Sequence, residues 1–186
     1  MGRFAGNVFL IGPMGSGKTT IGRKVAELLD LRFVDCDQEI ESRTGATVNL
    51  IFDIEGEAGF RQRESRMLEE LAAEEGLLLA TGGGAILNPR NRELIKRNGL
   101  VVWLKTSVEQ QVRRLSKDRS RPLLQTPDWK QTLVELALER DPIYRQMADL
   151  EFESRGHSIA RAARELSEAL LAARADPAEG ADHAAC

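Results

Sequence analysis

The sequence contains little cysteine, no long apolar run and no excess of charge of either sign. Its two cysteines, Cys36 and Cys186, lie far apart and lack metal-ligand spacing, so neither a disulfide framework nor a zinc site is implied. The 26 Lys and Arg against 29 Asp and Glu leave a net charge of −3, which argues against a nucleic-acid partner or an anionic-membrane surface. No apolar run approaches the roughly 20 residues that span a bilayer. The residues after Met1 also lack the apolar core of a secretion signal, and we therefore expect a cytoplasmic protein.

What the sequence does contain is an alternation of short apolar runs with longer stretches of helical periodicity. Of the 186 residues, 42% are hydrophobic and 30% are charged, which is typical of one globular domain. Nearly continuous apolar runs predict strands that are covered on both faces. The alternation therefore predicts an α/β fold around a parallel sheet. The strands are expected at residues 8–11, 31–34, 77–80, 100–104 and 149–152, and the last has the lowest apolar content.

The chain shows neither an internal repeat nor an interdomain linker, so residues 1–173 are expected to form a single domain. Residues 174–186 carry small and acidic residues without an apolar stripe, and we expect a frayed tail there. Residues 117–128 contain two prolines and several charges, which disfavour a helix. A loop of this length inside a compact domain is more often functional than idle.

A phosphate-binding motif follows the first expected strand. Residues 12–19 read Gly-Pro-Met-Gly-Ser-Gly-Lys-Thr and match G-x-x-x-x-G-K-[ST] in full. Glycines let successive backbone N–H groups point at phosphate oxygens, and the following helix adds its positive end. Lys18 can reach the β- and γ-phosphates, and the Thr19 hydroxyl can ligate Mg²⁺. The motif predicts binding of a nucleoside triphosphate with Mg²⁺ but does not distinguish a kinase from an NTPase.

Two aspartates stand at the end of the second expected strand, where an α/β sheet opens onto its ligand crevice. Asp35 or Asp37 could hold a Mg²⁺-bound water or accept a proton from an attacking hydroxyl. The alternative is that an aspartate here only caps the next helix, which would start near Gln38.

Two further segments are candidates for phosphate or substrate contacts. Gly82, Gly83 and Gly84 follow the third strand, and three glycines in a row indicate either a strained turn or a ligand against the backbone amides, although a simple tight turn is the alternative. Arg119 and Arg121 lie on the 117–128 loop and could fold over a transferring phosphate, unless the loop is merely a solvated basic segment.

Two arginines on expected helices are weaker candidates. Arg61 falls in what we expect to be a first helical turn, where a cation is unfavourable to the helix dipole. Arg140 stands two residues before Pro142, and we expect it to end a helix, where the dipole favours a cation. Solvation of Arg61 and capping by Arg140 are the alternatives to a binding role.

Taken together and in order, these segments resemble shikimate kinase, a family in the nucleoside-monophosphate-kinase-like P-loop group. The resemblance runs from about residue 6 to residue 172. It rests on Gly-Pro-Met-Gly-Ser-Gly-Lys-Thr-Thr-Ile-Gly, Asp-Cys-Asp-Gln-Glu-Ile-Glu, Ile-Phe-Asp-Ile-Glu-Gly-Glu-Ala-Gly-Phe-Arg, Thr-Gly-Gly-Gly-Ala, Arg-Pro-Leu-Leu and Glu-Arg-Asp-Pro-Ile-Tyr.

The resemblance implies a fold and an activity. The fold would be a three-layer α/β/α sandwich of the P-loop NTPase type, with a five-stranded parallel sheet in the order 2-3-1-4-5. The activity would be transfer of the ATP γ-phosphoryl group to the 3-hydroxyl of shikimate, on the route to chorismate and the aromatic amino acids. Shikimate, ATP and Mg²⁺ would be the ligands, and a monomer is expected.

The resemblance also implies roles for individual residues. Asp37 would bind the shikimate hydroxyls and serve as general base, Asp35 and Thr19 would support Mg²⁺, and the catalytic set would be Lys18, Asp37 and Arg121. Residues 38–64 would form the shikimate-binding region and residues 117–128 the lid, with Arg155 a loose candidate for adenine contact. The residues that would contact the nucleotide are Gly15, Ser16, Gly17, Lys18, Thr19, Thr20 and Arg121. The residues that would contact shikimate are Asp37, Arg61, Gly82, Gly83, Gly84 and Arg140. Of these, the two arginines would clamp the shikimate carboxylate.

Three other readings stay open at this point. A gluconate kinase of the same group would share the P-loop and lid but would not need two arginines that converge with a triple-glycine turn. A switch or assembly NTPase predicts a hydrophobic strand that ends in an aspartate, whereas here the third strand runs into glycines. A non-catalytic nucleotide-binding module is disfavoured because Lys18, Thr19 and Asp37 are all intact.

Overall fold

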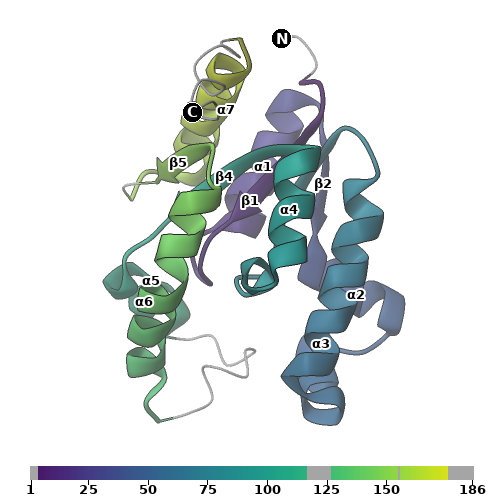
Figure 1. The fold of residues 1–186 in the computed structure, drawn as a ribbon. Helices are drawn as coiled ribbons and strands as arrows, with labels where there is room; N and C mark the ends of the chain where they lie inside the picture. The colour runs from purple at the N-terminus through teal and green to yellow at the C-terminus, as the bar shows by residue number, and fades with distance from the viewer. Residues whose placement is uncertain (1–3, 117–126, 155, 176–186) are drawn as a thin grey trace, which may run out of the picture.

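The structure, a computed structural model, describes residues 4–116, 127–154 and 156–175. Five parallel strands form one sheet in the order β2-β3-β1-β4-β5, as the resemblance implied. Helices cover both faces of the sheet, so the chain folds into three layers (Figure 1). The strands are β1 Asn7–Ile11, β2 Arg32–Asp35, β3 Leu77–Ala80, β4 Gly99–Lys105 and β5 Leu150–Glu153; the helices are α1 Lys18–Leu29, α2 Cys36–Thr44, α3 Val48–Ala72, the short 3-10 helix η1 Ala85–Leu87, α4 Pro89–Asn98, α5 Val108–Leu115, α6 Trp129–Met147 and α7 Ile159–Ala175.

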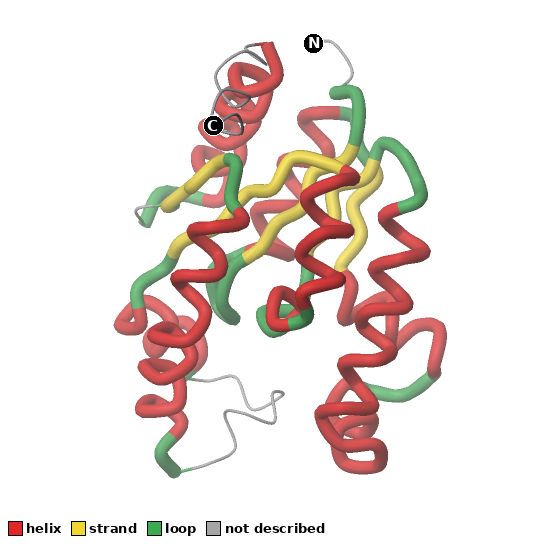
Figure 2. The backbone as a smooth tube through the Cα atoms, in the orientation of Figure 1, coloured by secondary structure: helices red, strands yellow, loops and turns green. Residues whose placement is uncertain are grey.

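Each predicted strand is confirmed to within a residue or two, and the differences have local causes. The second strand begins at Arg32 rather than Leu31 because Asp30 adopts a left-handed conformation after α1 and the Leu31 amide donates to the Ala26 carbonyl. The low apolar content of strand β5 fits its place at the edge of the sheet, where its residues are alternately exposed and half-buried. Strand β1 is buried throughout because it lies at the centre, between β3 and β4 (Figure 2).

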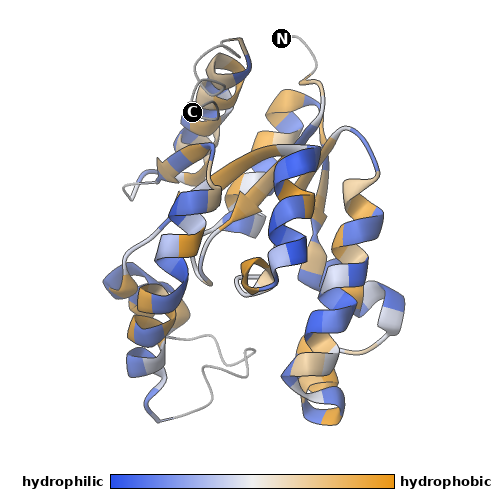
Figure 3. Ribbon diagram, in the orientation of Figure 1, coloured by the Kyte–Doolittle hydropathy of each residue, from blue (hydrophilic) through white to orange (hydrophobic). Residues whose placement is uncertain are grey.

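The hydrophobic core is divided by the sheet into two layers. On one face, α1 and α7 pack against β1 and β4 through residues such as Val25 and Leu166. On the other face, α3, α4 and α6 pack through residues such as Leu68, Ile95 and Tyr144. The apolar strands therefore lie between helices that turn their polar sides outward (Figure 3).

Two helices differ from the predictions. The helix that carries Arg140 does not end before Pro142; α6 continues through that proline to Met147. The carbonyl that loses its helical partner belongs to Leu138, a residue that is 75% exposed, so this turn of the helix faces water. Buried Tyr144 and Met147 anchor the next turn to the core. Arg140 therefore lies inside a helix, and the expected capping role at a helix end is wrong.

The second difference is a kink in α3. Gly56 has φ 68° and ψ −180°, a conformation outside the helical range, and it separates the segment before it from the helix that follows. Arg61 lies five residues after this kink, beyond the first turn in which the sequence placed it. The expectation that Arg61 lies in a first helical turn, where the helix dipole disfavours a cation, is thus wrong.

Helix α7 extends two residues into the segment that was predicted to be a tail. Arg174 and Ala175 still belong to α7, and the Arg174 guanidinium lies 4.9 Å from the centre of the Phe4 ring, which gives this last turn a packing partner. Residues 176–186 lie outside the described residues. Among the described residues, none of the helices combines the length and the apolar character that crossing a membrane requires.

Candidate functional site

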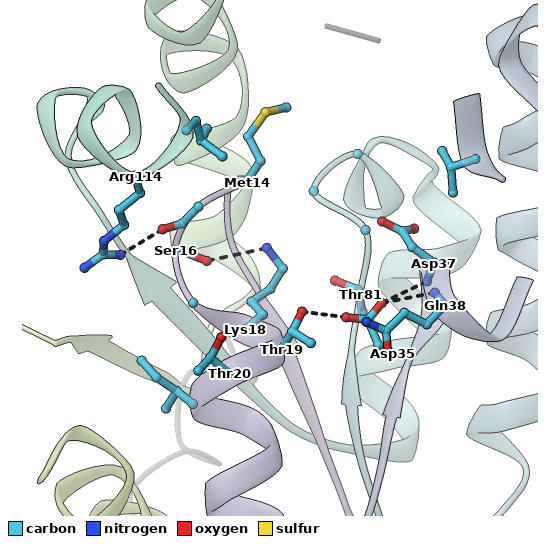
Figure 4. Close-up of a pocket in the computed structure, with 18 of the residues that line it drawn as sticks. Met14, Ser16, Lys18, Thr19, Thr20, Asp35, Asp37, Gln38, Thr81 and Arg114 are labelled. Atoms are coloured by element: carbon cyan, nitrogen blue, oxygen red, sulfur yellow. Dashed lines mark hydrogen bonds between the residues drawn. The ribbon is translucent and has the colours of Figure 1, made fainter. Parts of the chain in front are cut away.

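A cleft of about 720 Å³ lies at the carboxyl ends of the central strands. It is bounded by the loop after β1, the aspartates after β2 and the triple-glycine turn after β3, so the predicted segments come together at one edge of the sheet. Figure 4 shows the loop and the aspartates facing each other across this cleft. Its lining includes every described residue predicted to bind a ligand: Gly15, Ser16, Gly17, Lys18, Thr19, Thr20, Asp35, Asp37, Arg61, Gly82, Gly83, Gly84 and Arg140.

The loop after β1 has the backbone of a phosphate cradle. Gly12, Gly15 and Gly17 all have positive φ angles, of 138°, 74° and 97°. A side chain on Gly12 would also place its Cβ 2.6 Å from the Leu104 carbonyl oxygen of β4. The loop therefore needs glycine both for its conformation and for its close approach to the sheet.

Lys18 begins α1 and folds back over this loop. Its Nζ donates to the carbonyl oxygens of Gly12 at 2.7 Å and Pro13 at 2.9 Å. The ammonium group is thus held above the cradle by neutral backbone acceptors. A phosphate that enters the loop meets this positive charge together with the amino-terminal end of α1.

Thr19 and Asp35 form the link between α1 and the end of β2. The Thr19 Oγ1 donates to Asp35 Oδ2 at 2.6 Å, and the other carboxylate oxygen accepts from the backbone amides of Asp37 and Gln38 (Figure 4). Asp35 is therefore the N-cap of α2 as well as a partner of Thr19. The capping alternative considered for this aspartate is confirmed, and its role toward Mg²⁺ stays a prediction.

Asp37 stands in the first turn of α2 and lines the cleft opposite the triple-glycine turn. A Cβ on Gly82 would lie 3.1 Å from Asp37 Oδ1, so the carboxylate and the turn are in close contact. The carboxylate also lies near the positive end of the α2 dipole.

Close packing acts on the first and last residues of the triple-glycine turn. None of Gly82, Gly83 and Gly84 has a positive φ, so the strained-turn alternative is wrong. A Cβ on Gly82 would collide with the Glu64 carboxylate, and one on Gly84 would collide with the Arg61 guanidinium. The glycines let two charged side chains of α3 lie directly against the backbone of the turn.

Glu64 is a member of the site that the sequence analysis missed. It is fully buried, and its Oε2 accepts from Arg61 Nη1 at 2.8 Å, while Glu57 accepts from the same guanidinium on its exposed side. Burial, opposed by the Arg61 charge, raises the pKa of Glu64 to about 7. The three-residue spacing from Arg61 on one helix was a signal that could have revealed this pair.

Arg140 approaches the same end of the cleft from α6. It is only 7% exposed, and its charge acts on Glu64 and on the buried Tyr144 hydroxyl. Arg61 and Arg140, which are distant in sequence, are thus brought to one place by α3 and α6. Two guanidinium groups in a largely buried setting form a site suited to an anionic ligand.

Arg114 is a second residue that the sequence analysis missed. Its guanidinium donates to the Gly15 carbonyl at 2.8 Å and to Ser154 Oγ at 3.4 Å, and it lines the cleft beside the P-loop (Figure 4). Nothing in the sequence distinguished it from Arg113 on the amphipathic helix α5. The predicted lid arginine Arg121, its neighbour Arg119 and the adenine candidate Arg155 lie outside the described residues.

The raised pKa of Glu64 leads to a prediction about stability. Because the folded protein binds this proton more tightly than the unfolded chain does, the stabilisation is complete below about pH 4.5 and is lost as the pH rises through about 7. Relative to Glu64→Gln, the wild-type free energy of unfolding should therefore fall by about 1–3 kcal/mol across this range. Denaturant titrations at several pH values would measure it. Parallel profiles for the two proteins would show that Glu64 titrates normally.

The arrangement defines a class of protein. A parallel sheet in the order 2-3-1-4-5, a P-loop after its central strand and a pair of arginines at the other end of the same cleft are the features of a P-loop kinase that acts on a small molecule. The fold is shared with a gluconokinase from Sinorhizobium meliloti, at a TM-score of 0.59 and 19% identity over 92% of this chain and 94% of that one.

Similarity to known proteins identifies the family within this class. The family model for shikimate kinase matches residues 14–171. A shikimate kinase of Thioalkalivibrio sulfidiphilus is 55% identical over 87% of this chain and 85% of its own length. The solved structure of shikimate kinase from Acinetobacter baumannii in complex with shikimate superposes with a TM-score of 0.88, at 46% identity over 91% of this chain and 95% of that one. The chain belongs to the shikimate kinase family.

Proposed function

We propose that this protein transfers the γ-phosphoryl group of ATP to the 3-hydroxyl of shikimate, giving shikimate 3-phosphate and ADP. Family membership and the shikimate-bound relative from Acinetobacter baumannii support the substrate. Within this chain, the observation that carries the proposal is the anion site formed by Arg61 and Arg140 beside the triple-glycine turn. A carboxylated ring with several hydroxyls needs cations for its acid and nearby polar groups for its alcohols, and this end of the cleft offers both.

The nucleotide would occupy the P-loop end of the cleft. Backbone amides around Gly15 and Gly17 would hold the phosphates, and the Lys18 ammonium would move from its carbonyl partners to the β- and γ-phosphates. The side chains of Ser16, Thr19 and Thr20 also line this end of the cleft. Arg114 lies beside the loop where it could contact the nucleotide.

The residues present also fit Mg²⁺. Thr19 and Asp35 offer a hydroxyl and a carboxylate that already contact each other at 2.6 Å. Mg²⁺ is commonly bound by one or two protein oxygens together with substrate phosphates and water, so a larger acidic cluster is not needed. When bound, the ion would neutralise charge on the transferring phosphates. Asp35 would hold Thr19 and a metal-bound water in place.

Asp37 is proposed as the group that accepts the proton of the attacking hydroxyl. Its carboxylate faces the triple-glycine turn, so a substrate held by Arg61, Arg140 and the turn amides would present its hydroxyls to Asp37. As that oxygen forms its bond to the γ-phosphorus, the bond to the ADP oxygen breaks and the proton passes to Asp37. Lys18 and the lid residue Arg121 would neutralise the charge on the transferring group.

We propose one catalytic domain over residues 1–173, with residues 38–64 as the shikimate-binding region and residues 117–128 as a lid that excludes water. We also propose that the protein acts as a monomer. A cytoplasmic location is supported by the ATP requirement and by Cys36, a free and buried thiol of the kind that persists in reducing compartments.

The experiment that tests this function measures ADP formation with each component omitted in turn. We expect turnover only when ATP, Mg²⁺ and shikimate are all present, because water alone should be a poor acceptor in the closed cleft. Gluconate and quinate serve as matched alternative acceptors. Turnover with gluconate and none with shikimate would favour the related sugar-acid kinase, and steady hydrolysis without any acceptor would favour an NTPase.

A further inference from the structure

Tyr144 makes a hydrogen bond that connects two parts of the proposed shikimate site. It lies on α6, has no exposed surface, and its hydroxyl donates to the carbonyl oxygen of Gly83 at 2.5 Å. Gly83 is the middle residue of the triple-glycine turn. The aromatic ring packs against Trp103 of β4, with ring centres 5.8 Å apart. The hydroxyl is therefore held in place by the core and has a single defined acceptor.

Tyr144 and Arg140 lie on the same face of α6, because they are four residues apart. Between them stands Pro142, which lacks a backbone N–H and weakens the helix at this point. The Arg140 side chain also lies within reach of the Tyr144 hydroxyl, and burial, opposed by this guanidinium, raises the pKa of Tyr144. The hydroxyl therefore remains protonated and acts as a donor at physiological pH.

We propose that Tyr144 is a positioning residue that fixes Arg140 relative to the triple-glycine turn. Arg140 comes from α6, and Gly82, Gly83 and Gly84 come from the end of β3. The Tyr144 hydroxyl bond joins the helix that carries Arg140 directly to this turn. This inference rests on the proposed function, in which Arg140 and the turn amides contact the same substrate. Tyr144 itself would not contact the substrate.

The test compares wild type with Tyr144→Phe, which removes one hydroxyl and keeps the ring. Loss of this single bond should raise the KM for shikimate about three- to tenfold, while the KM for ATP stays near its wild-type value. Ser167→Ala is the matched control, since Ser167 Oγ donates to the Ala163 carbonyl at 2.8 Å and is equally buried, but in α7. It should lower Tm without a selective change in either KM.

A double-mutant comparison tests whether Tyr144 acts through Arg140. In an Arg140→Ala background, the addition of Tyr144→Phe should have little further effect on the KM for shikimate. A normal shikimate KM in Tyr144→Phe, or equal increases for shikimate and ATP, would overturn the proposal. Absence of shikimate-dependent ADP formation by the wild type would instead overturn the proposed function, so the two failures are distinguishable.

A spectroscopic measurement keeps the proposal testable if Tyr144→Phe does not fold. The chain contains only one tyrosine, so protein grown with 3-fluorotyrosine carries a single fluorine-bearing side chain, at position 144. Saturating shikimate should shift this ¹⁹F resonance, because substrate contacts on both Arg140 and the turn are transmitted to the hydroxyl between them. ADP with Mg²⁺ should shift it much less. An unchanged resonance with shikimate would contradict the positioning role.

Discussion

Lys18→Met should lower kcat about a hundred- to a thousandfold, with a smaller effect on shikimate binding. The Lys18 ammonium is held above the P-loop by two carbonyl oxygens, and a neutral side chain of similar length cannot stabilise the charge that develops on the transferring phosphate. Initial-rate measurements at saturating ATP and shikimate would give kcat directly. Titration with shikimate would show that the acceptor end of the cleft is intact.

Lys24→Met provides the matched control on the same helix. Lys24 pairs with Glu27 on the exposed side of α1, where its side chain is 47% exposed, so its loss should leave kcat close to wild type. A Lys18→Met enzyme that retains nearly normal kcat would mean that the phosphates lie elsewhere and that the cradle has been misassigned.

Arg140→Ala and Arg61→Ala should each weaken shikimate binding about ten- to a hundredfold while ATP affinity changes little. Each charge-assisted contact to a partly desolvated carboxylate contributes about 1.5–3 kcal/mol. Lysine should be a poor replacement at either position, since it lacks the planar fork. Because both side chains hold one group, the double variant should depart from additivity. Shikimate and ATP titrations of the three proteins would provide the comparison.

The two positions require different controls. Arg61→Ala also leaves the buried Glu64 without its partner, so it should be studied in a Glu64→Gln background as well, and Tm should be recorded for each variant. Arg63→Ala is the surface control, because Arg63 lies on the same helix and forms an ion pair with Glu55 at the protein surface. Normal shikimate affinity with weakened ATP affinity in either variant would move that arginine to the nucleotide end.

Much of the fold was predictable because its signals are local. Most of the strands have nearly continuous apolar runs, and the P-loop motif fixes a loop conformation and a helix start within eight residues. The path of α6 was not predictable in this way. Proline is a reliable local breaker, but here the burial of Tyr144 and Met147 beyond it outweighs the lost hydrogen bond, and burial of that kind depends on β4 and η1.

The candidate site was predictable in its residue types but not in its contacts. Asp35, Asp37, Arg61 and the glycines were found from position and resemblance. The reason for the glycines was missed, because only the folded chain brings Glu64 and Arg61 against the turn. Glu64 and Arg114 were missed for a related reason: most charged residues on amphipathic helices are solvated, and sequence alone does not show which of them are buried.

The central place of β1 has a consequence for the synthesis of the chain. Strand β1 is made first, yet its neighbours β3 and β4 begin only at Leu77 and Gly99. Until β4 has been made, a strand that is buried throughout in the folded protein therefore has an unpaired edge on one or both sides. Nascent chains that stop before Gly99 cannot complete the sheet around it and should be prone to aggregation. We therefore expect the strand that presents the phosphate cradle to be the part of the nascent chain most in need of protection until Gly99 has been translated.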